Sequence, residues 1–115
     1  MKIILDCYGG DNSPFAHVEG AINAVNKNKD LFVTLVGKSS EISAELEKYE
    51  FNEDQIEILN ADEVIDCNDK PTSAIREKKN SSLCFSYDLL KHDDSYKAMV
   101  SSGSTGAILA GSIMK

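Results

Sequence analysis

The chain contains 115 residues, of which 42% are hydrophobic and 27% are charged, and its formal net charge is -7 at pH 7. A chain of this length forms one domain and buries roughly two-thirds of the surface that its unfolded state would expose. The composition is typical of a folded globular protein and argues against intrinsic disorder. The acidic balance argues against nucleic acid as a partner, because nucleic-acid affinity rests on phosphate contacts from a basic face.

The N-terminus and the cysteines indicate the cellular compartment. Asp6 interrupts the first apolar run too early for a signal peptide, and no run reaches the roughly 20 apolar residues that span a bilayer. The chain has three cysteines, at 7, 67 and 84, and no C-x-x-C motif. An odd number of cysteines far apart in sequence predicts reduced thiols rather than a disulfide framework. We therefore expect a cytoplasmic protein. Cys84 is predicted to fill the core, and Cys7 is not favoured as a nucleophile because no histidine lies close to it in sequence.

The predicted elements begin with a strand and a helix. Lys2–Asp6 is a short apolar run that ends near a Gly-Gly turn, which is typical of a buried strand. Ser13 and Pro14 predict the start of a helix, as an N-cap and a proline in the first turn. That helix presents one apolar face, made of Phe15, Val18, Ile22 and Val25 at helical spacing.

The rest of the chain continues to alternate between strands and helices. We predict a strand over 31–37, followed by a helix that opens at Ser39 or Ser40 and has Ile42, Leu46 and Tyr49 on one face. A strand over 55–61 comes next, then an irregular polar segment over 62–71 and a short helix that holds Thr72, Ile75 and Arg76. The last three predicted elements are a helix marked by Leu83, Tyr87 and Leu90, a strand over 97–102 and a helix over 107–115.

This order predicts an α/β fold, a three-layer αβα Rossmann-like arrangement in which helices cover both faces of a parallel sheet. The last helix ends on Met114 and Lys115 with no cap and no returning strand. We therefore expect residues 1–115 to be the N-terminal portion of a single α/β domain that is truncated at its C-terminal end.

Two glycine-rich turns follow the first and fourth predicted strands, where ligands bind in such sheets. The turn SSGSTGA at 101–107 can present backbone amides and hydroxyls to an anion at a helix N-terminus, although a turn capped by Ser104 or Thr105 is the alternative. Neither turn is G-x-G-x-x-G, and the second strand does not end on an acid. The sequence therefore does not favour a nucleotide.

The turn DCYGGDNSP at 6–14 brackets its glycines with Asp6 and Asp11. These carboxylates can orient a substrate, bind a divalent cation or steer a neighbouring donor, and the alternative is that they serve as turn residues. Gly9 and Gly10 suggest that something approaches the backbone closely.

A basic segment, AIREKKNSS at 74–82, stands in this otherwise acidic chain. It is either a solvated face or a site for phosphate or an acidic partner, with Asn80, Ser81 and Ser82 adding hydrogen-bonding groups. His17 and His92 have no metal-ligand or triad partner at useful spacing, so both are predicted to be structural, and no metal site is expected.

Taken together, the segments LDCYGGDNSP, ILNADEVIDCNDKPTSAIREKKNSS and VSSGSTGAILAG resemble, in order and spacing, the blocks of bacterial PlsX-type phosphate acyltransferases of fatty-acid and phospholipid synthesis. The resemblance runs along the whole chain. The chain departs from the family pattern in having Cys7 and Tyr8 in place of Ala-Met, Asn60 in place of His, Ser102 in place of Ala and Ser104 in place of Asn.

The resemblance implies a fold like that of isopropylmalate dehydrogenases and phosphotransacetylases, and a reaction in which inorganic phosphate attacks the thioester of acyl-acyl carrier protein to make acyl phosphate. It implies no cofactor, a homodimer of longer chains with these residues as the N-terminal third, and peripheral membrane contact through residues beyond Lys115. An acyl-CoA-dependent phosphotransacetylase and a non-catalytic module that binds a phosphorylated metabolite are the alternatives.

Site residues follow as a hypothesis. The catalytic set is Asp6, Asp11, Lys78 and Lys79, and the phosphate-binding or substrate-binding set is Gly9, Gly10, Arg76, Ser81, Ser102, Gly103, Ser104, Thr105 and Gly106. In this hypothesis the turn at 103–106 cradles phosphate or the acyl-phosphate product, and the turn at 6–11 shapes the adjoining wall. The cations at 76, 78 and 79 either neutralise phosphate or meet the acidic carrier protein. Phosphate itself is the nucleophile, so no covalent protein nucleophile is required.

Overall fold

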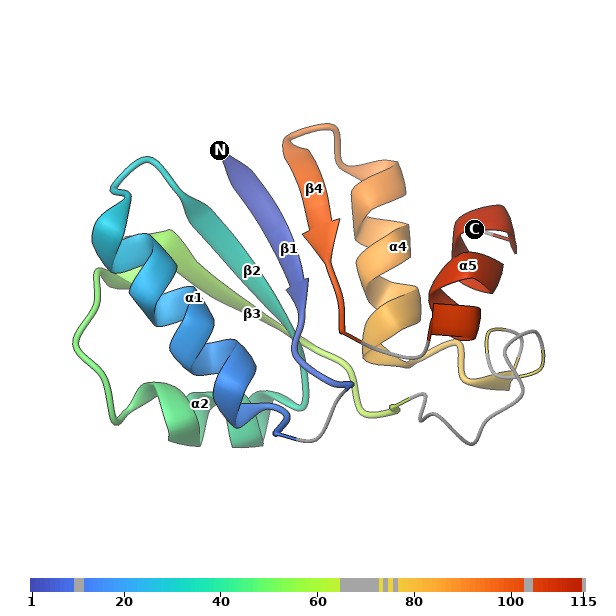
Figure 1. Cartoon of the computed structure of the whole chain (residues 1–115), viewed down its shortest axis with the longest axis horizontal. Helices are drawn as coiled ribbons and strands as arrows, with labels where there is room; N and C mark the ends of the chain where they lie inside the picture. The colour runs from blue at the N-terminus through green and yellow to red at the C-terminus, as the bar shows by residue number, and fades with distance from the viewer. Residues whose placement is uncertain (10–11, 65–72, 74, 76, 103–104, 115) are drawn as a thin grey trace.

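Helices pack on both sides of a parallel sheet in the computed structural model of the chain, which describes residues 1–9, 12–64, 73, 75, 77–102 and 105–114 (Figure 1). The elements in chain order are β1 (Lys2–Asp6), α1 (Phe15–Lys27), β2 (Phe32–Gly37), α2 (Ser39–Leu46), the 3-10 helix η1 (Glu53–Gln55), β3 (Ile56–Asn60), α4 (Ser82–His92), β4 (Tyr96–Val100) and α5 (Thr105–Met114). The predicted α/β class with a parallel sheet is confirmed.

The strand order of the sheet places a change of direction beside β1. The order is β3-β2-β1-β4, and β1 pairs in parallel with both β2 and β4. The chain first builds outward from β1 through β2 to β3, and then returns to add β4 on the other side of β1. The carboxyl ends of β1 and β4 therefore flank a topological switch point, which is where ligands bind in open α/β sheets.

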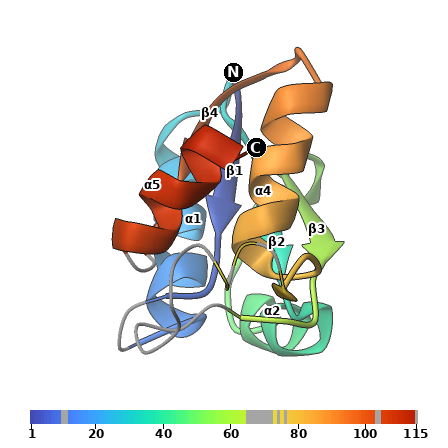
Figure 2. The same cartoon turned by 90° about the vertical axis from the view of Figure 1, so that its right-hand side faces the viewer.

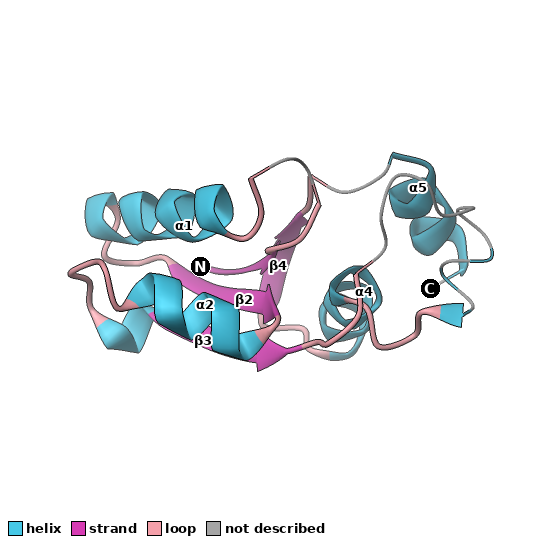
Figure 3. Ribbon diagram, turned by 90° about the horizontal axis from the view of Figure 1, so that it is seen from below, coloured by secondary structure: helices cyan, strands magenta, loops and turns pink. Residues whose placement is uncertain are grey.

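Side chains of β1 alternate between the two faces of the sheet and so divide the core into two layers. Ile3 and Leu5 pack with the cluster formed by α1 and α2, whereas Ile4 packs with residues of α4 on the opposite face. Figure 3 shows α1 and α4 on opposite sides of the sheet, and Figure 2 shows α5 beside α4. Strands that are covered on both faces read as continuous apolar runs, which explains the composition of β1 and β2.

Helix α2 begins at Ser39 as predicted, whereas the predicted Ser13 cap of α1 is wrong, and both helix starts have tertiary partners nearby. The N-cap of α1 is Pro14 and has no side-chain hydrogen bond, since the Ser13 hydroxyl bonds to Gly9 instead. The N-cap of α2 is Lys38, and the first amide of that helix, on Ser39, donates to the side chain of Asn60 at 3.0 Å. Both starts therefore depend on contacts with other strands and turns.

One residue of the predicted apolar face of α1 is exposed. Phe15 is 56% exposed, and Ala21 joins Val18, Ile22 and Val25 in the buried set. At the first position of the helix, the Phe15 ring lies outside the sheet contact and beside the Lys48 ammonium. The helical stripe that faces the sheet therefore begins one turn later than predicted.

The boundaries of β2, β3, β4 and α5 shift by one or two residues. Strand β2 starts at Phe32, β3 is shortened by η1, β4 runs from Tyr96 to Val100, and α5 begins two residues earlier than predicted. Of the predicted short helix, Ser73, Ile75 and Glu77 are helical, whereas Thr72, Arg76 and most of the polar segment 62–71 lie outside the described residues.

The contact between Gly37 and Tyr8 gives a stability test. A methyl group on Gly37 would lie 2.3 Å from Tyr8 Cε2, and the Tyr8 ring is held from the other end by its hydroxyl, which donates to Glu41 at 2.7 Å. We expect Gly37→Ala to lower the free energy of unfolding by about 1–3 kcal/mol, the usual cost of overpacking.

The matched control is Gly20→Ala in α1, where a methyl group meets no atom within 4 Å. Its helix propensity should raise the free energy of unfolding by about 0.5–1 kcal/mol. Urea denaturation of the two variants measures both effects. Equal stability of Gly37→Ala and wild type would contradict this account of the Tyr8 packing.

Candidate functional site

The candidate site lies where β1 and β4 end side by side. Leu5 of β1 pairs with Val100 of β4, so the residues that follow each strand emerge at the same edge of the sheet. Asp6 is the last residue of β1, and Ser101 and Ser102 follow β4 directly. The structure thus brings together the two glycine-rich turns that the sequence separates by more than ninety residues.

Asp6 is a buried carboxylate that joins three elements. It is 1% exposed, its Oδ1 accepts from the backbone N–H of Tyr8 at 3.1 Å, and its Oδ2 accepts from the Ser101 hydroxyl at 2.9 Å. The side chain of Ser82, the first residue of α4, also hydrogen-bonds to it. A carboxylate this deeply buried is stable only when such donors replace water, and these donors tie β1, β4 and α4 together.

Burial raises the pKa of Asp6 above its ordinary value. The hydrogen bonds from Ser82, Tyr8 and Ser101 and the nearby His17 act in the opposite direction but do not cancel the effect of burial. Carboxyls with shifted pKa values cluster at functional sites and also occur in structural networks, and Asp6 lies at the end of a strand where ligands bind in such sheets.

The turn after β1 takes its shape from Gly9 and Ser13. Gly9 has a φ of 117°, which a residue with a side chain rarely adopts. Its N–H donates to the Ser13 Oγ at 3.2 Å, and the Ser13 hydroxyl donates to the Gly9 carbonyl at 3.0 Å. Both polar groups of this peptide segment are therefore satisfied. Gly10 and Asp11, which the sequence analysis places in the site, lie outside the described residues.

The turn after β4 is tied to Gly9 by Ser102. The Ser102 hydroxyl donates to the Gly9 carbonyl at 3.1 Å, and its oxygen lies 2.7 Å from His17 Nε2. Thr105 and Gly106 open α5 immediately beyond this contact, whereas Gly103 and Ser104 lie outside the described residues. The N-terminal amides of a helix have no partner within the helix, so the start of α5 at Thr105 and Gly106 has the polarity that an anion requires.

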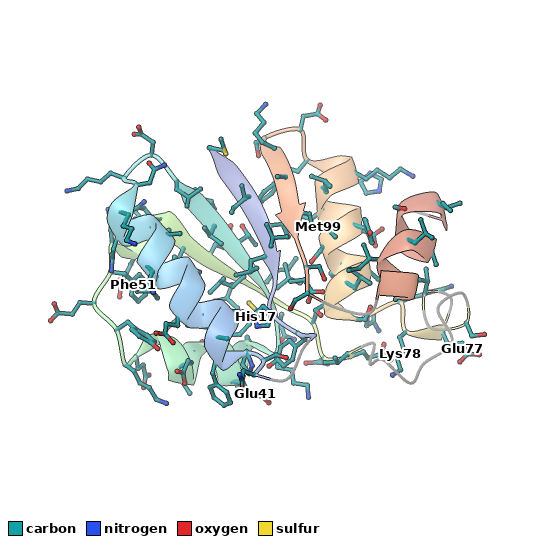
Figure 4. All side chains as sticks on the ribbon, viewed as in Figure 1. His17, Glu41, Phe51, Glu77, Lys78 and Met99 are labelled. Atoms are coloured by element: carbon teal, nitrogen blue, oxygen red, sulfur yellow. The ribbon has the colours of Figure 1, made fainter. Side chains whose placement is uncertain are left out.

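His17 lies beside the candidate site, although its sequence context predicts a structural role and does not place it there. It occupies the first turn of α1, and Figure 4 shows it between α1 and the end of β1. Burial lowers its pKa, and its Nδ1 is buried without a hydrogen-bond partner among the described residues. A usable signal existed in the sequence: the first turn of a helix that directly follows a glycine-rich turn faces that turn.

The basic segment reaches the site through the start of α4. Lys78 Nζ donates to the Val64 carbonyl at 2.9 Å, while Lys79 is exposed. Ser81 is fully buried, and its side chain caps α4 by accepting from the N–H of Cys84 at 3.2 Å. The next residue, Ser82, hydrogen-bonds to Asp6, so the cap of α4 connects the segment to the buried carboxylate. Figure 4 labels Lys78 at this end of the molecule. Arg76 lies outside the described residues.

Cys7 does not have the environment of a nucleophile. It is fully buried, and burial, followed by the adjacent Asp6 charge, raises the pKa of its thiol to about 12. The thiol therefore stays protonated at neutral pH, and thiols in that state are poor nucleophiles. Cys84 is also buried and lies in the cluster between α4 and α5, as predicted for a core cysteine. Cys67 lies outside the described residues.

The described part of the chain shows neither a metal-binding cluster nor a membrane-spanning helix. Within it, no cluster of three or more His, Cys, Asp or Glu residues has an arrangement that could hold a metal ion. None of its helices is both long enough and apolar enough to cross a bilayer.

The raised pKa of Asp6 predicts a pH-dependent stability. As the pH rises, the unfolded chain ionises first, near the ordinary value of 3.8, and the folded chain ionises later. Ionisation therefore favours the unfolded state across the window between the two pKa values. The free energy of unfolding of wild type, minus that of Asp6→Asn, should fall as the pH rises from about 4 to about 7. A difference that grows with pH over this range would contradict a raised pKa.

Comparison with known proteins gives consistent matches along the chain. A family model described as "Fatty acid synthesis protein" matches residues 1–115. A protein from Fusobacterium nucleatum named phosphate acyltransferase is 49% identical over 115 residues, which are 100% of this chain and 34% of that protein. Proteins of the same name from Clostridium tetani and Clostridium acetobutylicum are 47% and 45% identical, over 98% and 99% of this chain and 34% of each relative.

The chain thus spans about a third of the length of these relatives, as their 34% coverage states. The family model covers every residue, including both turns of the candidate site and the cap of α4. The chain belongs to the fatty acid synthesis protein family.

Proposed function

We propose that this chain supplies the phosphate site of an acyltransferase that moves a fatty acyl group from acyl carrier protein to inorganic phosphate, forming acyl phosphate for phospholipid synthesis. One observation carries the proposal. The turns after β1 and β4 are bonded together through Asp6 with Ser101 and through Gly9 with Ser102, directly in front of α5. Relatives that are 45–49% identical carry the name phosphate acyltransferase.

The proposed reaction needs no nucleophile from the protein. An oxygen of phosphate attacks the thioester carbonyl carbon, the carbon–sulfur bond breaks, and the carrier leaves as a thiolate that takes up a proton. The buried thiol of Cys7, with its pKa raised to about 12, agrees with this scheme. The protein must hold phosphate against the thioester, and such orientation supplies up to roughly 7–11 kcal/mol in well-aligned systems.

The N-terminus of α5 is the part of the site suited to phosphate. We assign phosphate or acyl phosphate to Gly103, Ser104, Thr105 and Gly106, where helix amides face an anion with the favourable end of the helix dipole. The same donors can stabilise the oxyanion that develops on the thioester carbonyl, and each well-aimed donor of this kind contributes roughly 3–4 kcal/mol.

Asp6 serves the site by positioning other groups. A carboxylate in contact with phosphate would repel it, and both Asp6 oxygens already accept bonds from Tyr8 and Ser101. The hydroxyls of Ser81 and Ser102 are also hydrogen-bonded already, the first at the cap of α4 and the second to the Gly9 carbonyl. We therefore assign all three to the frame of the site. Gly9, with Gly10 and Asp11, forms the adjoining wall in this proposal.

The basic segment is proposed to meet the acidic carrier protein or to neutralise phosphate. Lys78 reaches the Val64 carbonyl, whereas the Lys79 side chain is exposed and free to contact a partner surface. Lys79 is thus the better candidate for carrier recognition, and Arg76 and Lys78 for charge near the phosphate. A cytoplasmic homodimer with peripheral membrane contact remains part of the proposal.

The direct test measures thiol release and acyl phosphate in the full-length protein, with acyl carrier protein and acyl-CoA as alternative donors. We expect both products in equal amounts, only when phosphate is present, and faster with the carrier protein. Faster reaction with acyl-CoA would identify a phosphotransacetylase-like enzyme. Phosphate binding without thiol release would show a non-catalytic module and refute the proposal.

Cys7→Ala tests whether the protein supplies the nucleophile. We expect the variant to keep its thioester-cleavage rate within about threefold of wild type, because the thiol is buried and protonated. Cys84→Ala, which removes another buried thiol, controls for the cost of a small core cavity. A loss of more than about a hundredfold in Cys7→Ala alone would indicate a covalent acyl-cysteine intermediate.

Lys79→Ala tests the docking of the carrier. Removing one exposed charge at an interface should raise the KM for acyl carrier protein about twofold to fivefold at low salt, and less at high salt. Lys97→Ala is the control, since Lys97 is an exposed lysine near the amino end of β4, opposite the site edge. An equal KM in both variants would remove Lys79 from the carrier surface.

A further inference from the structure

His17 makes the contact that joins α1 to both turns of the site. Its Nε2 lies 2.7 Å from the Ser102 Oγ, across 85 residues of sequence, and that hydroxyl lies 3.1 Å from the Gly9 carbonyl. Ser102 precedes the proposed phosphate-binding turn, and Gly9 shapes the opposite wall. One hydroxyl and one imidazole therefore connect two walls of the site.

The positions of the protons follow from the chemistry of these groups. A carbonyl oxygen only accepts, so the single proton of Ser102 goes to Gly9, and the Ser102 oxygen accepts from Nε2–H of His17. The other ring nitrogen, Nδ1, is buried and has no partner among the described residues. A proton there would be a buried, unpaired donor, which costs free energy. The neutral Nε2–H tautomer is therefore the one that allows both hydrogen bonds, from His17 to Ser102 and from Ser102 to Gly9.

The state of the ring agrees with this assignment. Burial lowers the pKa of His17, which favours the neutral form, and the nearby Asp6 opposes that effect only in part. The Gly9 carbonyl, which accepts the Ser102 proton, also accepts a hydrogen bond from the Ser13 hydroxyl at 3.0 Å, so a second contact holds it in place. A donor with a fixed tautomer and an acceptor with a fixed conformation make a bond of defined geometry.

We infer that His17 is a positioning residue of the phosphate site: its Nε2–H holds the Ser102 hydroxyl against Gly9 and so fixes the position of Ser102 after β4. This inference rests on the proposed phosphate site but not on acyl transfer. The Ser102 hydroxyl then links His17 to Gly9 in a fixed geometry, and α1 contributes to the site as well as covering the sheet.

The first test is the affinity for inorganic phosphate, measured by calorimetric titration of the full-length protein. His17→Leu removes the donor and should weaken phosphate binding roughly fivefold to tenfold, the ratio that the loss of one hydrogen bond produces. His17→Gln keeps an N–H donor on a side chain of similar length and should restore most of the affinity. His92→Gln, at an exposed histidine near the end of α4, should leave the affinity unchanged.

Ser102→Ala keeps the test decisive if His17→Leu does not fold, because Ser102 is exposed and its loss leaves no cavity. It should weaken phosphate binding to the same degree as His17→Leu, and the double variant should be no weaker than either one. Additive effects of the two substitutions, or phosphate binding equal to wild type in Ser102→Ala, would overturn the inference.

The second readout is the tautomer of His17, observed from its ring nitrogens by NMR without any substrate. We expect a proton on Nε2 in wild type and a change in that signal in Ser102→Ala. A proton on Nδ1, or a ring signal that is the same in both proteins, would refute the hydrogen bond from His17 Nε2–H to Ser102. Phosphate binding that depends on His17 in a protein that cleaves no thioester would leave the inference standing while the proposed acyl transfer fails.

Discussion

The rest of the site depends on the buried carboxylate of Asp6. It ends the central strand β1, and its hydrogen bonds come from the next turn, from the segment after β4 and from the first residue of α4. A carboxylate that is 1% exposed must have such partners, because leaving it without them would cost several kcal/mol. The need to satisfy one charge therefore fixes how three distant segments meet.

This constraint also bears on the chemistry that we propose for the site. A carboxylate accepts hydrogen bonds, so the hydroxyl and amide donors near Asp6 are bonded to it. The N-terminus of α5 is then the part of the site that is suited to an anion. Cys7, next to Asp6, is kept protonated by burial and by that carboxylate, so the strongest potential nucleophile of the turn is suppressed. An acceptor of acyl groups that brings its own nucleophile, such as phosphate, fits these surroundings.

The fold was largely predictable from local patterns, because strands covered on both faces read as apolar runs and glycines mark their ends. Strand β1 was predicted residue for residue at Lys2–Asp6. The cap of α1 was predicted wrongly, because Pro14 occupies the N-cap and the Ser13 hydroxyl bonds to Gly9. Helix α2 begins at Ser39 as predicted, but its first amide donates to Asn60 of β3 rather than to a local serine side chain. Capping statistics describe a helix alone and could not identify that tertiary partner.

The candidate site was predictable only in part for the same reason. Glycine-rich turns after strands could be located, and the parallel topology implied that they meet. The partners of Asp6 and His17 could not be identified, since Ser101 and Ser102 lie 95 and 85 residues away from them. For His17 the one signal in the sequence is its place in the first turn of the helix after a glycine-rich turn, and that signal does not name its partner, because the register of β4 beside β1 brings Ser102 to it.

The most direct measurement follows the backbone amide signals of the protein by NMR while inorganic phosphate is added. We expect the largest shifts, which saturate, at the amides of Thr105 and Gly106, and smaller shifts at Gly9, whose carbonyl accepts from Ser102. Shifts that are confined to the exposed lysines, or that do not saturate, would contradict a phosphate site at the carboxyl ends of β1 and β4.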